Sequence, residues 1–172
     1  MDNIAYQKIL FRTAMCVMVC DGDIHHSEIL EMEVAFKQTD FFKDLVFKDE
    51  VDFVLDKFKN SEKEFLAECV ENLSKAAMSP VQELQILELA LRIIYADNRV
   101  DKNELEFLKI IKGCLSVPDE IFHSRFGSVP FLDFKGFRYK KSQDSKFIID
   151  NIVLPDVDSM ALLFDSSEAG GQ

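Results

Sequence analysis

The sequence predicts an all-α fold, a compact bundle of about six to seven helices built on two helix–turn–helix repeats. Apolar residues recur at helical spacing over most of the first 126 residues. Ser61, Ser79 and Asp101 are each followed three residues later by Glu or Gln, the pattern of a capping box at a helix start. Gly and Pro are scarce, six and four in 172 residues. This scarcity disfavours an all-β domain, because such domains need many tight turns.

The first half of the chain is expected to form three helices. Residues 4–20 follow helical spacing and become apolar on all sides after Thr13, which indicates a central, buried helix. An Asp-Gly-Asp sequence then ends this helix. A second helix is expected near residues 27–38 and a third over residues 47–59, both with apolar residues on one face.

The capping signals start the next helices. They predict helices at about 62–78, 80–96 and 102–113. Pro80 takes the first position of one of them, where its missing N–H group is not needed. A short helix is expected after Pro118.

The chain changes character after Gly127. We therefore expect a helical domain over residues 1–126, a partly irregular appendage packed on it over 127–164, and a disordered tail over 165–172. A short β-hairpin within the appendage remains an alternative. The aromatic side chains of Phe131, Phe134 and Phe137 are expected to fasten the appendage to the helices, since they would otherwise leave apolar area in water.

Composition narrows the classes of function. A net charge of −11 disfavours a nucleic-acid surface, which needs clustered Lys and Arg. The longest apolar run, residues 14–20, is too short to cross a membrane. No signal-peptide pattern is present at the start, so we expect a cytoplasmic protein with reduced cysteines. The common catalytic sequence motifs are missing, and we therefore predict that the chain is not an enzyme.

Two stretches of the chain are similar at an offset of 76 residues. Residues 14–32 and 90–108 each contain an apolar helix, an Asp-led turn, an aliphatic residue and then a Glu four residues on. Asp21 aligns with Asp97, and Glu28 aligns with Glu104. We expect two helix–turn–helix units that pack together.

With these turns and the downstream Glu in both copies, the chain resembles the TerB family of tellurite-resistance proteins over roughly residues 4–125. The resemblance implies a compact all-helical domain with a cytoplasmic stress-response role. It also implies that acidic residues in the turns hold a divalent cation, and that the protein works with membrane-bound partner proteins. Arg99 stands opposite Asp23 in the alignment, so the two turns are not symmetric.

The two turns together supply five carboxylates as candidate metal ligands. They are Asp21, Asp23, Glu28, Asp97 and Glu104. If the repeat brings the turns together, these oxygens suit Ca²⁺ or Mg²⁺, and we expect the first three side chains to be exposed. Neither turn alone is an EF-hand, because the first two ligand positions would fall on apolar residues.

Ordinary turn chemistry competes with the cation site. Gly22 and Asn98 are residues that tolerate the left-handed conformation at a helix end. Asp101 and Glu104 are explained as caps, whereas His25 is a poor N-cap and leaves Glu28 less well explained. Arg99 is a candidate to neutralise the carboxylates internally.

Zinc is disfavoured as the bound metal. Cys20, His25 and His26 lie close in sequence, but a structural zinc site needs four ligands, usually in spaced pairs. Cys16 and Cys20 fall in a run expected to be core, where Cys is usually a small apolar residue.

Two functions therefore remain from the sequence. In the first, the chain is a non-enzymatic stress-response module that binds a divalent cation, a partner protein or both at the face formed by the turns. In the second, it is a metal-free helical adaptor whose contacts are made by the appendage.

Overall fold

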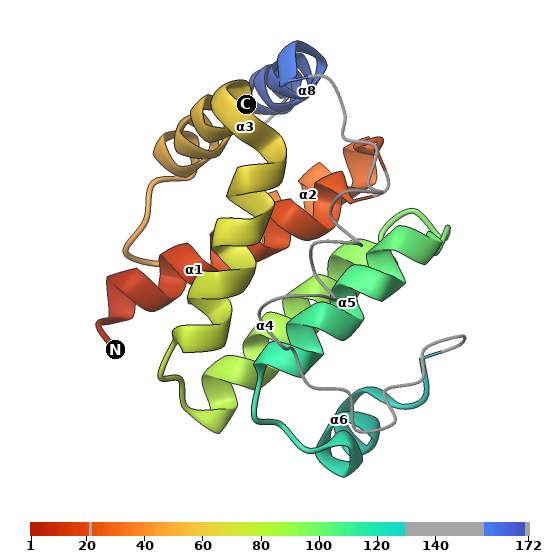
Figure 1. Cartoon of the computed structure of the whole chain (residues 1–172). Helices are drawn as coiled ribbons and strands as arrows, with labels where there is room; N and C mark the ends of the chain where they lie inside the picture. The colour runs from red at the N-terminus through yellow and green to blue at the C-terminus, as the bar shows by residue number, and fades with distance from the viewer. Residues whose placement is uncertain (21, 130–156, 171–172) are drawn as a thin grey trace.

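A computed structural model describes residues 1–20, 22–129 and 157–170, and every regular element in these ranges is an α-helix (Figure 1). The helices are α1 (Asn3–Val19), α2 (His26–Gln38), α3 (Phe47–Lys75), α4 (Pro80–Ile94), α5 (Lys102–Cys114), α6 (Asp119–Phe126) and α8 (Val157–Gly170). The predicted all-α bundle is confirmed. The β-hairpin considered for the appendage, and Phe131, Phe134 and Phe137, lie outside the described residues.

Helix α1 forms the centre of the bundle. All side chains from Ala14 to Cys20 are at most 2% exposed, which explains why this stretch is apolar on all sides. α1 packs against both α3 and α4 (Figure 1). In the part of the chain that the structure describes, no helix has the length and apolar character needed to cross a membrane.

Helix α3 joins the two helices that the sequence predicts over 47–59 and 62–78. The break between them survives as a kink at Ser61, whose backbone is extended (φ −165°, ψ 106°). The Ser61 Oγ accepts a hydrogen bond from the Glu64 backbone N–H at 3.4 Å. The predicted cap is therefore present, and Ser61 separates two helical segments of α3, as the sequence predicts.

Helix α8 is the described part of the appendage and packs against α2 and α3. Met160 and Phe164 are buried, and the Phe164 ring lies 6.2 Å from the Phe47 ring. α8 continues to Gly170, into a stretch where the sequence analysis expected a disordered tail. Met160 and Phe164 lie one helical turn apart, so contact with the bundle favours helix where the local pattern alone is weak.

Candidate functional site

The two helix–turn–helix units match closely in length. Helices α2 and α5 both contain 13 residues, and their first and last residues are each 76 positions apart. Each turn lies between two helices, as the repeat predicts. Asp21, the partner of Asp97 in the alignment, lies outside the described residues.

A residue in the left-handed conformation reverses the chain at the same place in both turns. Gly22 has φ +82° and Asn98 has φ +60°, and the two positions are 76 residues apart. Their backbone N–H groups donate to carbonyls of the preceding helix end, Val19 at 3.1 Å and Tyr95 at 3.3 Å. Gly and Asn are the residues that adopt this conformation at least cost. The residue types at these two positions therefore predict the turn geometry.

The two aligned glutamates cap their helices. The Glu28 Oε2 accepts the His25 backbone N–H at 2.8 Å, and the Glu104 Oε2 accepts the Asp101 backbone N–H at 3.2 Å. Both side chains are buried, at 1% and 2% exposure. The expectation that Glu28 is exposed is wrong, and so is the view that capping explains it less well. The bond to the Glu side chain needs only the backbone N–H of the N-cap residue, so a histidine can supply it, although Asp101 also accepts a cap hydrogen bond with its side chain, from the Asn103 N–H.

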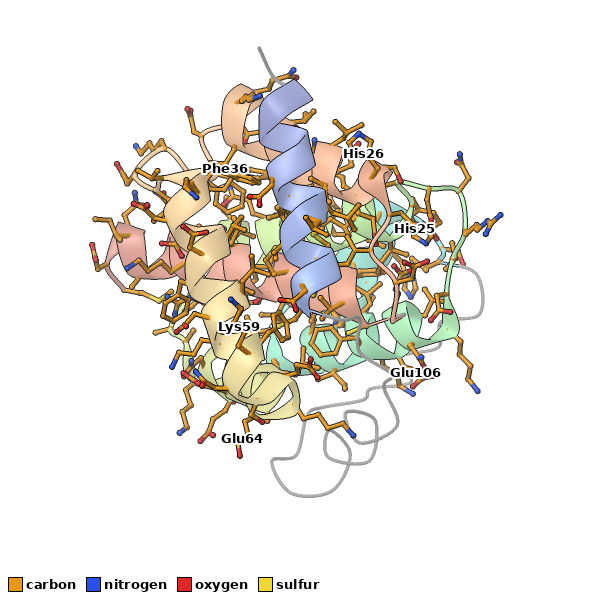
Figure 2. All side chains as sticks on the ribbon, turned by 90° about the horizontal axis from the view of Figure 1, so that it is seen from above. His25, His26, Phe36, Lys59, Glu64 and Glu106 are labelled. Atoms are coloured by element: carbon orange, nitrogen blue, oxygen red, sulfur yellow. The ribbon has the colours of Figure 1, made fainter. Side chains whose placement is uncertain are left out.

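One side-chain contact connects the two turns directly. The His25 Nε2 lies 3.2 Å from the Asp97 Oδ2. His25 stands at the start of α2, on the side of the molecule where the α4–α5 turn passes (Figure 2). The other oxygen of Asp97, Oδ1, accepts the Arg99 backbone N–H at 2.9 Å. The two turns therefore lie side by side, as expected from packing of the repeats.

Sequence reasoning missed the contact between His25 and Asp97. It named Arg99 as a candidate for the neutralising role, but the Arg99 side chain is exposed and forms no ion pair with a described residue. The alignment of the two copies contained a signal for this contact. It places His25, a possible cation, where the second copy has the acidic N-cap Asp101. A second bridge, from Arg92 Nε to Glu31 Oε2 at 3.3 Å, ties α4 to α2 nearby.

The described carboxylates of the turns do not form a metal cluster. Among the residues that the structure describes, no three side chains of the types His, Cys, Asp and Glu lie close enough together to hold a metal ion. Asp23 is exposed, whereas Glu28 and Glu104 are buried in their caps.

The cysteines belong to the core. Cys20 is fully buried, and its Sγ donates to the Cys16 carbonyl at 2.9 Å. Burial raises the pKa of the Cys16 thiol well above its ordinary value, and the neighbouring Cys69 and Cys20 thiols raise it further.

Comparison with known proteins gives one match. The family model described as tellurite resistance protein TerB matches residues 10–125. No curated protein and no solved structure matches the chain. The matched range includes both turns and all helices from α2 to α5.

Proposed function

The chain belongs to the TerB family of tellurite resistance proteins, and we propose that it is a non-enzymatic, cytoplasmic stress-response module that binds a divalent cation at the face formed by its two turns. The contact between His25 and Asp97 carries this proposal, because it joins the turns on one side of the bundle. A partner protein would bind to the same face, with the cation or in its place.

We divide the five candidate carboxylates between two roles. Glu28 and Glu104 each use one oxygen to accept a backbone N–H group, so we assign them to holding the turns in shape. Asp21, Asp23 and Asp97 are the proposed ligands. Ca²⁺ takes about six to eight oxygens and Mg²⁺ about six, so backbone carbonyls and water would complete the shell.

Titration with Ca²⁺, Mg²⁺ and Mn²⁺ tests the cation. Binding to the folded state alone should raise the free energy of unfolding by about 2.7 kcal/mol at a hundredfold excess over Kd, with heat in calorimetry and a higher melting temperature. The variant with both Asp21→Asn and Asp97→Asn should lose this response. Asp40→Asn, an exposed site in the α2–α3 connection, is the matched control. No heat and no thermal shift with any of the three cations would refute the cation site.

A metal-free adaptor is the second candidate, and one observation favours it. Both oxygens of Asp97 already have partners, the His25 imidazole and the Arg99 backbone N–H. In this version the contacts are made by the appendage, where Leu162 on α8 is 67% exposed. Co-purification of a partner from native cells that is lost in Leu162→Asp but kept in the Asp21→Asn and Asp97→Asn variant would favour the adaptor.

A further inference from the structure

A cavity of about 330 Å³ lies between the N-terminal half of α1 and the C-terminal end of α3. Figure 1 shows these two segments side by side, away from the α4–α5 turn. Lys8, Ile9 and Arg12 line it from α1, and Asn72, Lys75 and Ala76 line it from the end of α3. The volume is of the size that suits a small ligand, since ligand pockets span roughly 300–1,000 Å³.

The charge of this cavity is opposite to that of the chain. All the ionisable side chains that line it are cationic, namely Lys8, Arg12 and Lys75, although the net charge of the protein is −11. Lys75 is paired with Glu71 at 2.6 Å. Lys8 and Arg12 form no ion pair with any described residue, so two positive charges in one cavity are left without a described counter-charge.

The guanidinium of Arg12 is held in place. It lies over the Phe53 ring, with its Cζ 4.0 Å from the ring centroid, a geometry in which cation and ring attract each other. Its Nε is buried and has no hydrogen-bond partner among the described residues. A buried donor without an acceptor is rare in folded proteins. Because the Arg12 side chain is already ordered, it also loses less entropy when it binds an anion.

We propose that this cavity binds a small organic anion that carries an apolar group. The anionic group pairs with Lys8 and Arg12, and the apolar group packs against Ile9 and Ala76. The Asn72 amide offers a further hydrogen-bond donor at the rim. The cavity opens to the surface, and its two cations without a described counter-charge favour a carboxylate or sulfonate of modest size over a neutral molecule.

A pair of dyes tests the anionic part of this proposal. Anilinonaphthalene sulfonate carries a negative charge, and phenylnaphthylamine has the same ring system without it. We expect the sulfonate to bind the full chain at least about tenfold more tightly, because a hydrogen bond to a charged group contributes about 1.5 kcal/mol or more. Amide shifts in NMR spectra should concentrate on residues 5–12 and 72–76. Equal affinity for the two dyes would refute the proposal.

Three variants locate the binding charges. Lys8→Gln and Arg12→Gln should each weaken binding of the sulfonate dye several-fold, and the double variant should weaken it about tenfold or more. Lys59→Gln is the matched control, because Lys59 is exposed elsewhere on α3 (Figure 2). Lys8→Gln provides a test even if loss of the Arg12 contact with Phe53 impairs folding. Unchanged affinity in Lys8→Gln, or NMR shifts confined to another part of the bundle, would overturn the assignment.

Discussion

Replacing Glu28 by alanine removes the oxygen that accepts the His25 backbone N–H at the start of α2. The side chain is only 1% exposed, so water cannot readily take its place. Replacing it by glutamine keeps one oxygen acceptor, removes the negative charge and puts an NH2 group in place of the second oxygen. The two substitutions therefore separate the capping role of Glu28 from a role as metal ligand.

The structure sets the size of the effect. A buried donor left without its acceptor destabilises the fold by about 1–3 kcal/mol, and loss of a helix cap by about 0.5–2 kcal/mol. We expect Glu28→Ala to lower the free energy of unfolding by about 2 kcal/mol and the melting temperature by about 4–8 °C. Glu28→Gln should change the free energy by less than about 1 kcal/mol. The same pair at Glu104 should behave alike, since Glu104 makes the equivalent bond.

Guanidinium unfolding followed by circular dichroism measures both substitutions, and Glu68→Ala at an exposed position of α3 serves as a comparison for the effect of mutation alone. The capping argument fails if Glu28→Ala is as stable as the original chain. It also fails if Glu28→Gln is destabilised as much as Glu28→Ala, because the charge and not the hydrogen bond would then matter. Cation titration of Glu28→Gln tests whether Glu28 is also a metal ligand. If the cation still raises the melting temperature of this variant, the ligands are the aspartates.

Three further predictions test the α8 contact, the left-handed residues of the turns and the buried thiol. Phe164→Ala should lower the free energy of unfolding by about 3 kcal/mol, because it opens a cavity under α8. Leu162→Ala, at a site that is 67% exposed, should change this free energy by less than about 0.5 kcal/mol. Chemical unfolding of the two variants measures the difference. Gly22→Ala should destabilise by about 1–2 kcal/mol, because φ is +82° there. Asn98→Gly should have a small effect, because relieved strain and greater freedom of the unfolded chain oppose each other. Burial raises the pKa of the Cys114 thiol to about 12, so its reactive thiolate is scarce below that pH. Mass spectrometry should find slow alkylation by iodoacetamide at pH 8 that accelerates on unfolding.

The repeat was predictable because it depends on residue types that favour particular local backbone conformations and hydrogen bonds. A left-handed residue in the turn and a Glu at the third position of the next helix each have their own sequence signature. These signatures recur at an offset of 76, and α2 and α5 follow that offset at both ends. The central position of α1 was predictable as well, because only a helix surrounded by others is apolar on every side.

Long-range contacts were not predictable in the same way. The pair between His25 and Asp97 joins positions 72 residues apart, and it depends on how two units pack. The same holds for α8, whose burial comes from Met160 and Phe164 meeting α2 and α3. The burial of Glu28 followed from a backbone bond that does not require an acidic or hydroxyl N-cap residue, so a rule based on residue type missed it.

The contact between His25 and Asp97 sets the terms on which a cation could bind. The Asp97 Oδ2 faces the imidazole and the Oδ1 faces the Arg99 N–H, so a cation must compete with at least one of them for that carboxylate. A partly exposed ion pair contributes about 1 kcal/mol or less, which lowers cation affinity by about fivefold at most. Such a competitor is weak compared with the attraction of two or three carboxylates for a divalent ion. In the proposed site the imidazole would therefore lower the affinity of the two-turn face for a cation without excluding the cation.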